Sequence, residues 1–424
     1  MSAVDWTPAT WSGRTVPDGV RIEQLAAGLD AIGDLRLSAT SVGVRESAHR
    51  DPDAPDLALL DVGRAVPAAI VTTTNRVKAA PCLIGIEHVA SGPIRAVIVN
   101  SGNANACTGE TGLRDARAMT DAVAGALGCS PDEVVPMSTG VIGVPLPVDR
   151  IVAGVPALAA DLAEGVGAAS ALARAMMTTD SRPKQCAVRV HAGEVTATVA
   201  GVAKGAGMIE PAMATMLSII VTDVALEAEE AQDILREVAD RTFNRISVDS
   251  CGSTNDTVLL LATGTAGPAD ALGREALVAA VEHVSADLAH RIVTDGEGVT
   301  RVANLQVIGA PDVATARELG RAVGASALFR TALHGSDPNW GRVLAAMGAS
   351  DTPFDPARVS VRFGDVLVCR DGGAVPYDHD TAVATLREPE VTIGIDLGLG
   401  DASAAYLVAD LSAGYVHVNA EYTT

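Results

Sequence analysis

Aromatic residues are scarce in this chain. They make up 3% of its 424 residues, although 48% of the residues are hydrophobic. The core must therefore be built from alanine, valine, leucine and isoleucine rather than from large rings. A chain of this length can bury two or three sizeable cores, and its mean hydropathy of +0.27 is typical of a globular protein.

Positive charge is also in short supply. The chain has 31 lysines and arginines against 52 aspartates and glutamates, a net charge of −21. This balance argues against nucleic acid or an anionic membrane as a partner. No hydrophobic run approaches the length of a membrane helix, and the polar first 20 residues lack the apolar core of a signal peptide. We therefore expect a cytoplasmic protein.

Cysteine pairs and metal-binding motifs are missing as well. The six cysteines are widely spaced and include no C-x-x-C, which favours reduced cytosolic thiols over a disulfide framework or a zinc site. The eight histidines form no H-E-x-x-H. The sequence therefore predicts no metal site.

The most distinctive stretch runs from Lys204 to Asp223. Glycines and a proline lead to Ala214-Thr215, and the apolar run 217–221 that follows is typical of a buried strand. This layout suits cleavage of the Ala214–Thr215 peptide by the threonine itself. The new α-amine, with a pKa of about 7.7–8.0, could then serve as the base for the Thr215 hydroxyl. A plain turn before a strand is the alternative.

Two further polar loops have the composition of a site. Residues 100–109 hold three asparagines and two glycines between an expected strand and an expected helix, so they form either a capped turn or a loop near a site. Thr139-Gly140 could place a hydroxyl and a backbone N–H side by side, as stabilisation of a tetrahedral oxyanion requires. On composition alone, a plain turn explains this pair better.

A family resemblance joins these stretches. The string Lys-Gly-x-Gly-Met-Ile-x-Pro-x-Met-Ala-Thr-Met-Leu from Lys204 resembles the self-processing site of the ornithine acetyltransferases, also called glutamate N-acetyltransferases, of arginine biosynthesis. Six or seven such strings occur along residues 40–424, in the same order as in the family. Ser250-Cys251-Gly252 departs from the usual Gly-Asp-Thr, and Val299-Thr300-Arg301 from the usual Ala-Thr-Lys.

The resemblance implies a fold and a maturation step. The fold is α/β, an N-terminal-nucleophile-like layered sandwich with an additional smaller α/β lobe. After an irregular extension over residues 1–35, self-cleavage would give an alpha chain of residues 36–214 and a beta chain of residues 215–424. The two chains would stay intertwined, and two of each would form a heterotetramer.

The resemblance also implies an activity, the transfer of an acetyl group from N2-acetylornithine to glutamate through an acetyl-Thr215 intermediate. Lys204 is our candidate for a substrate carboxylate and Glu297 for the distal ammonium. No cofactor is expected, and acetyl-CoA is left open as an alternative acetyl donor. The implied oxyanion hole is Thr139 and Gly140, and the implied substrate-binding residues are Thr178, Lys204, Thr215, Glu297, Asn419 and Thr424.

Three alternatives remain at this point. A protein of the same fold could hydrolyse its substrate, as an amidase or aminopeptidase. A paralogue could act on a specialised amino acid. A non-catalytic homologue would stay as one inert chain.

Hydrophobic periodicity and breaker residues outline the elements. Strands and turns are expected over residues 38–99 and again over 353–398, and a strand-like stretch up to Val418. Expected helices cover residues 21–30, 112–127, 149–162, 167–178, 227–241, 269–290 and 313–331. Further strands are expected at 185–191, 194–202, 217–221 and 258–262.

Overall fold

The computed structural model describes residues 16–45, 54–210 and 216–421. Within them the chain divides into two units. The larger unit runs to Asn244 and resumes from Gly252 to Asp295, and the smaller unit takes Arg245–Cys251 and the chain from Gly296 onward.

Two sheets form the centre of the larger unit. Neighbouring strands are antiparallel except for β9 with β11 and β5 with β6, which are parallel. The six-stranded sheet has the order β1 (Val20–Leu25), β7 (Lys184–Ala192), β8 (Val195–Lys204), β9 (Leu217–Ala225), β11 (Thr257–Pro268) and β4 (Ala68–Thr72). The four-stranded sheet has the order β2 (Arg36–Thr40), β3 (Leu57–Val66), β5 (Ile94–Asn103) and β6 (Val134–Val141).

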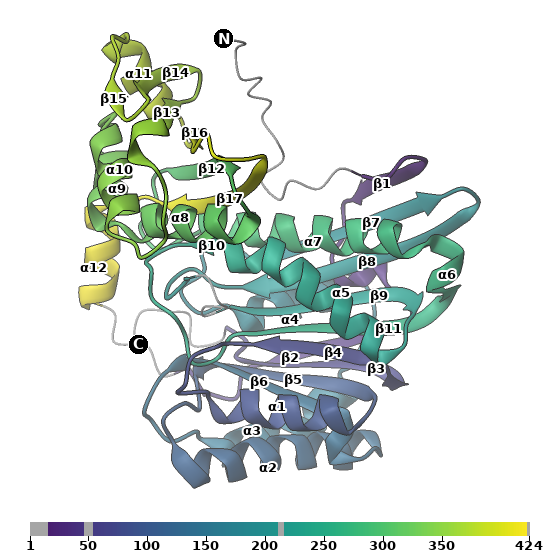
Figure 1. Ribbon diagram of the computed structural model, residues 1–424. Coiled ribbons are helices and arrows are strands. Elements are labelled where there is room, and N and C mark those ends of the chain that lie inside the picture. The colour runs from purple at the N-terminus through teal and green to yellow at the C-terminus, as the bar shows by residue number, and fades with distance from the viewer. Residues whose placement is uncertain (1–15, 46–53, 211–215, 422–424) are drawn as a thin grey trace. The chain divides into compact units, whose positions relative to one another are not determined.

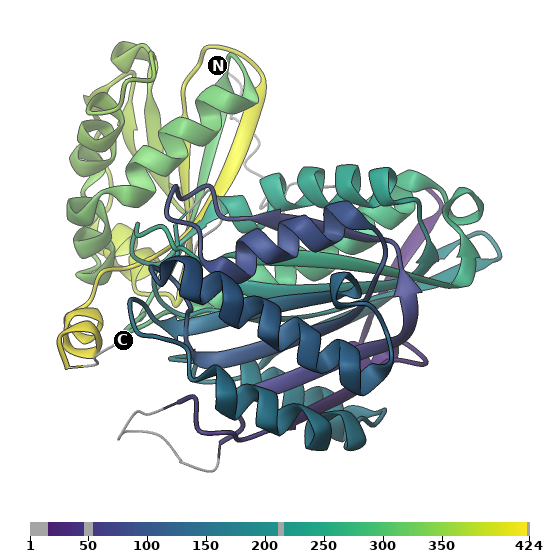
Figure 2. The same cartoon turned by 90° about the horizontal axis from the view of Figure 1, so that it is seen from below.

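Helices cover the outer faces of both sheets. On the six-stranded sheet, α5 (Ala228–Arg241) packs on β4 and α7 (Arg274–Thr294) on β7 and β8 (Figure 1). The four-stranded sheet is covered by α1 (Ala80–Ser91), α2 (Gly109–Leu127) and α3 (Val148–Ala160), which lie in front of it in Figure 2. The result is the layered α/β sandwich that the sequence predicts.

The main core of the larger unit lies between its two sheets. It is aliphatic, as the shortage of aromatic residues requires, and α4 (Val166–Met176) contributes to it. Burying aliphatic side chains stabilises the fold by roughly 25 cal/mol per Å² of apolar surface. Fully buried members from both sheets include Leu60, Val97, Val202, Ile219 and Leu259.

The smaller unit is the additional α/β lobe. Its core gathers between one sheet and the helices α8 (Val313–Ala325), α9 (Ala327–His334) and α10 (Trp340–Gly348), and the buried Tyr406 and Phe363 belong to it. The remaining helices are α11 (His379–Leu386) and α12 (Ala413–Glu421). The sheet has the order β10 (Ile246–Ser247), β17 (Ala402–Ala409), β12 (Val302–Ala310), β16 (Glu390–Asp396), β13 (Ser360–Phe363), β14 (Val366–Arg370) and β15 (Gly373–Ala374).

The predicted cut lies between two paired strands. β8 and β9 are antiparallel neighbours, with Lys204 opposite Leu217 and Val202 opposite Ile219. Residues before and after the Ala214–Thr215 bond thus belong to one sheet, and the bond is not at the boundary between the two units. The cleavage, and with it the division into 36–214 and 215–424, stays a prediction.

The expected helix over residues 21–30 is wrong. The structure has the edge strand β1 there, paired with β7 from Val20 to Leu25, and then a 3-10 turn at Leu29–Ala31. The apolar residues of this short segment fit both a helical and a strand period. The hydrogen bonds with β7 favour the strand.

Two of the long expected helices are each divided. Gly273, with a φ of +87°, separates α6 (Ala269–Leu272) from α7. Ser326 separates α8 from α9 and caps α9, because its hydroxyl accepts a hydrogen bond from the Phe329 N–H at 3.3 Å.

Four helices were missed by the sequence outline, and one of them is α10, which lies beyond the expected helix that ends at residue 331. α1 and α11 lie in the regions where only strands and turns were expected. The strand-like interpretation of the C-terminal stretch is also wrong, since β17 ends at Ala409 and α12 begins at Ala413. Ser412 caps α12 by accepting from the Tyr415 N–H at 3.1 Å, and a serine before a helix is a signal readable in sequence.

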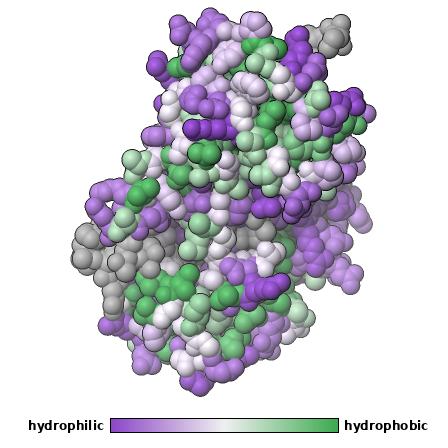
Figure 3. Space-filling view, turned by 60° about the vertical axis from the view of Figure 1, so that its left-hand side comes forward, coloured by the Kyte–Doolittle hydropathy of each residue, from purple (hydrophilic) through white to green (hydrophobic). Residues whose placement is uncertain are grey.

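None of the helices in the described ranges combines the length and hydrophobicity that crossing a membrane requires. Hydrophilic residues are spread over the face of the molecule in Figure 3, with hydrophobic ones in small groups between them.

Candidate active site

Thr139 and Gly140 lie near the end of β6, beside the end of β5. The two strands are parallel there, with Ser101 opposite Thr139 and Gly102 opposite Gly140. Gly140 has a φ of +131°, and a Cβ on it would stand 2.3 Å from the carbonyl carbon of Gly102. Only glycine lets the two backbones come this close.

Lys204 meets Thr139 across the two sheets of the larger unit. Lys204 is the last residue of β8, and its ammonium donates a hydrogen bond to Thr139 Oγ1 at 3.1 Å. Both residues are 1% exposed. The structure therefore brings together two residues that the resemblance assigned to different tasks.

Asp180 links Thr178 to this pair. Its carboxylate accepts from the Thr178 N–H at 3.0 Å, the Gly205 N–H at 2.7 Å and the Lys184 ammonium at 2.7 Å. Lys184 also bonds Asp295 at 2.6 Å. Burial alone would raise the pKa of Asp180, but the charges of Lys204 and Lys184 together hold it well below its usual range. A buried carboxylate thus fixes the backbone beside Thr178 and Lys204.

The segment Ser253–Thr257 ties β6 to the start of β9. The Asn255 amide donates to Ala104 O at 2.6 Å and to Ser138 O at 2.8 Å, next to Thr139. Asp256 accepts from the Met216 N–H at 2.9 Å. Met216 directly follows the predicted nucleophile in sequence, so this string fixes the chain on the beta side of the predicted cut.

The asparagines of residues 100–109 hold their own loop together, although α2 begins after Thr108 without a side-chain cap. The side-chain amides of its three asparagines all donate to backbone carbonyls, for example Asn100 to Asn103 O at 2.9 Å and Asn105 to Gly112 O at 2.9 Å. Ser138 donates to Asn100 Oδ1 at 2.6 Å. Among the described contacts these side chains serve the loop, and they support Thr139 through its neighbour.

Glu297 and Asn419 meet within the smaller unit. The Asn419 amide, on α12, donates to Glu297 Oε2 at 2.8 Å. Gly298 has a φ of +66°, and a Cβ on it would stand 2.1 Å from the Tyr415 nitrogen. The second glycine of Asp-Gly-Glu-Gly therefore makes room for α12, whose Ser412 hydroxyl bonds the Gly298 carbonyl.

Acidic groups surround Tyr415 on the same helix. Its hydroxyl donates to Asp249 at 3.4 Å. Burial raises the pKa of Tyr415, and the nearby Asp249, Cys251 and Glu297 add to the rise. Ser250 stands in the left-handed region with a φ of +61°, at a position where the resembling family usually has glycine.

The described site residues thus fall into two groups. Thr139, Gly140, Thr178 and Lys204 belong to the larger unit, and Glu297 and Asn419 to the smaller one. Ala214, Thr215 and Thr424, which include the predicted nucleophile, lie outside the described residues.

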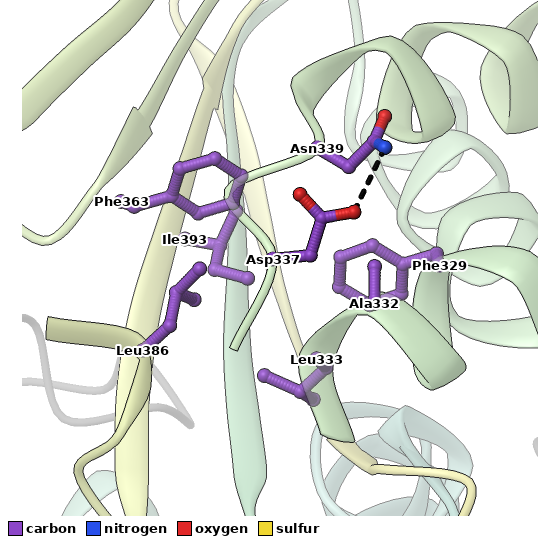
Figure 4. Close-up of a pocket in the computed structure, with 8 residues that line it drawn as sticks. All are labelled: Phe329, Ala332, Leu333, Asp337, Asn339, Phe363, Leu386 and Ile393. Atoms are coloured by element: carbon purple, nitrogen blue, oxygen red, sulfur yellow. Dashed lines mark hydrogen bonds between the residues drawn. The ribbon is translucent and has the colours of Figure 1, made fainter. Parts of the chain in front are cut away.

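The described residues contain no cluster of three or more histidine, cysteine or acidic side chains that could hold a metal ion. All six cysteines are free thiols. Figure 4 shows a small hollow in the smaller unit, with Asn339 donating to Asp337 at 3.0 Å at its edge. None of the predicted site residues lines it, and we assign it no part in the chemistry. Its lining consists of Phe329, Ala332, Leu333, Asp337, Asn339, Phe363, Leu386 and Ile393.

Comparison with known proteins decides the family. The model of the ArgJ family matches residues 36–424. The chain belongs to the ArgJ family. The match begins directly after the stretch that the sequence outline set apart as an extension.

Curated ArgJ relatives are similar over nearly their whole length. The arginine biosynthesis bifunctional protein ArgJ of Symbiobacterium thermophilum is 47% identical over 377 residues, which are 87% of this chain and 92% of the relative. The ArgJ protein of Geobacter sulfurreducens is 45% identical, over 89% of this chain and 97% of the relative. A solved ornithine acetyltransferase from Mycobacterium tuberculosis, in complex with ornithine, is 38% identical over 45% of this chain and 98% of its own, with a TM-score of 0.40.

Two residues of this ArgJ site were missed by sequence reasoning. Asp180 lies two residues after Thr178 and four before Lys184, but an acidic residue near a lysine gives no sign of burial. Asp256 follows shortly after the Ser250-Cys251-Gly252 departure, and no role was predicted for it. Both act through hydrogen bonds to backbone far along the chain.

Replacing Asp256 by asparagine should change how stability depends on pH. Burial raises the pKa of Asp256 well above its ordinary value, against the opposing effects of the Met216 N–H and the Lys204 charge. Below about pH 4 the folded and unfolded forms are both protonated; as the pH rises, the unfolded form loses its proton first. Wild-type stability should therefore fall with rising pH, by up to about 1.4 kcal/mol per pH unit, and Asp256→Asn should lack this loss.

Urea unfolding at about pH 5 and about pH 8 measures this difference. Asp233→Asn is the control, because Asp233 is a carboxylate on α5 whose side chain is 71% exposed. Equal slopes for wild type and Asp256→Asn would contradict the prediction.

Proposed function

We propose that this chain is a self-processing acetyltransferase that moves the acetyl group of N2-acetylornithine to glutamate. The ArgJ relatives carry the name of arginine biosynthesis proteins, which supports this substrate class. The observation that carries the proposal is the contact of Thr139, beside Gly140, with Lys204. Lys204 begins the string that contains Ala214-Thr215, so the predicted oxyanion donors and the predicted nucleophile are joined by a short segment of chain.

The first half-reaction forms an acetyl ester. The α-amine of Thr215 takes the proton of its own hydroxyl as Oγ attacks the acetyl carbonyl carbon. The Thr139 hydroxyl and the Gly140 N–H donate to the oxyanion that develops. The C–N bond then breaks, the proton passes to the leaving nitrogen, and ornithine departs.

The second half-reaction returns the enzyme to its starting state. The amine of glutamate attacks the ester carbonyl and loses a proton to the Thr215 α-amine. The C–O bond breaks, Thr215 Oγ regains its proton, and N-acetylglutamate leaves. Such a double displacement gives ping-pong kinetics.

Several finer assignments are part of the proposal. Thr178, Lys204, Thr215, Glu297, Asn419 and Thr424 contact the amino-acid substrates. Two alpha and two beta chains assemble into a heterotetramer in the cytoplasm. Acetyl-CoA as a second acetyl donor would account for the word bifunctional in the relatives' name, and incubation of acetyl-CoA with glutamate and the enzyme tests it.

The acetyl-enzyme is the expected result that tests the function. Processed protein incubated with N-acetylornithine alone should release about one ornithine per active site, and its 215–424 chain should gain the mass of one acetyl group. Addition of glutamate should remove that mass. N-acetylnorvaline, which has the same carbon skeleton without the distal amine, is the matched control substrate. Steady release of acetate without glutamate would instead identify a hydrolase.

A further inference from the structure

Lysine is rare in this chain, and two of the three lysines lie in one buried cluster. Three of the 31 basic residues are lysines, at 78, 184 and 204, and the others are arginines. Lys184 and Lys204 are each 1% exposed, and the charges of both act on Asp180. Arginine carries its charge on a large planar group, whereas lysine carries a compact ammonium. A chain that otherwise uses arginine thus has ammonium groups in its buried site.

The direction of the Lys204–Thr139 hydrogen bond leaves a donor for the reaction. An ammonium has only donors, so the Thr139 oxygen accepts this bond. A hydroxyl has one hydrogen of its own, which stays free to point elsewhere. The contact therefore sets the orientation in which Thr139 can donate.

We propose that Lys204 is a positioning residue that acts through Thr139, orienting and polarising its hydroxyl toward the oxyanion. A hydroxyl that accepts from a cation becomes a stronger donor, because linked hydrogen bonds polarise one another in a low-dielectric site. This inference rests on the proposed function only in taking Thr139 as an oxyanion donor. It replaces the substrate-carboxylate role that the resemblance suggested for Lys204, since it places the effect of Lys204 on the bond-making step.

Asp180 supplies the counter-charge that a buried ammonium requires. It is 3% exposed and accepts from the N–H of Gly205, the residue after Lys204, at 2.7 Å. Its other cation partner, Lys184, is bound in turn by Asp295 at 2.6 Å. Asp180 thus faces the charges of both buried lysines and holds the backbone that carries Lys204.

The test uses p-nitrophenyl acetate beside N-acetylornithine. The ester offers the same acetyl group but has no carboxylate or ammonium for the enzyme to bind. Turnover is referred to the concentration of processed chain, measured by denaturing mass spectrometry. Lys204→Met should lower kcat on both substrates by roughly 10- to 100-fold and change KM little. This loss of kcat is smaller than the roughly 10²- to 10³-fold loss expected for Thr139→Val, which removes an oxyanion donor. Lys204→Gln keeps a donor without the charge and should lie between wild type and Lys204→Met.

A double variant gives the deciding measurement. If Lys204 acts through Thr139, Lys204→Met in the Thr139→Val background should cost no more than about twofold. Losses that multiply would overturn the proposal, as would unchanged kcat on p-nitrophenyl acetate with a raised KM for N-acetylornithine. Wild type that cleaves the ester but transfers no acetyl group to glutamate would refute the proposed function alone.

Two control variants separate this role from a structural one. Lys78→Met removes the third lysine, which donates to Thr73 O rather than to Thr139 or Asp180, and should leave kcat unchanged. Lys184→Met removes the other buried partner of Asp180 without touching Thr139. A loss of kcat with Lys184→Met equal to that with Lys204→Met, at equal folded fraction, would show that Lys204 matters only for charge balance.

Discussion

Protein carrying Thr215→Ala should stay in one piece and transfer no acetyl group above background. The substitution removes the hydroxyl that attacks the Ala214–Thr215 carbonyl during maturation and the acetyl carbonyl during turnover. Loss of a nucleophile that acts together with its base costs about 10⁴-fold or more in kcat. Both readouts should therefore fail together.

Denaturing mass spectrometry and N-terminal sequencing check the first readout, and the transfer assay checks the second. Wild type should give two fragments, one of which begins Thr-Met-Leu-Ser. Thr215→Ser is the matched control, because it keeps a hydroxyl and an α-amine and should keep both reactions at a reduced rate. A Thr215→Ala chain that still transfers acetyl groups would refute the mechanism.

Gly140→Ala should damage both stability and turnover. At a φ of +131° a side chain is strained by about 1 kcal/mol, and the new Cβ would stand 2.3 Å from Gly102 C and 2.5 Å from Asn103 N. Both atoms are backbone, so the ends of β5 and β6 must separate. We expect a loss of about 3 kcal/mol or more in unfolding free energy and roughly 10²-fold in kcat, because the Gly140 N–H moves with the strand.

Gly143→Ala is the matched control for this steric argument. Gly143 follows three residues later with a φ of +82°, but a Cβ there would meet nothing within 4 Å. It should cost only about 1 kcal/mol from the backbone strain and leave kcat nearly unchanged. Chemical denaturation and steady-state kinetics measure both, and equal losses for the two variants would mean that the contact with Gly102 does not matter.

Many individual elements were predictable because their periodic signals are local, whereas the layered architecture was implied by the family resemblance. The apolar run after Met216 forms β9, and the helix with the acidic first turn forms α5, nearly within the expected bounds. Gly140 was singled out by the resemblance, and the structure adds the reason: it makes room for the backbone of Gly102. The segment of β1 fitted both a helical and a strand period, and its pairing with β7 determined that it forms a strand. Local sequence patterns do not show which strand will be the partner.

The charged part of the site was not predictable in the same way. Lys204 was assigned to a substrate carboxylate because the family motif marks it as a substrate-binding residue and a cation near the cut site could pair with an anion. Its buried bond to Thr139 joins residues 65 positions apart, on strands of two different sheets. Burial decides whether Asp180 is a solvated carboxylate or a counter-charge, and burial depends on the assembled sheets.

The pairing of β8 with β9 determines how the two fragments of the processed protein would be held together. Before the cut, β8 and β9 pair within one polypeptide. After the cut, two separate polypeptides would have to associate in solution and pack their side chains into a shared core. Reassembly would then depend on concentration, while the folded particle persists for as long as it takes to open. The matured enzyme would thus be long-lived through a high barrier to opening rather than through reversible refolding, and its heat tolerance should be described by a half-life.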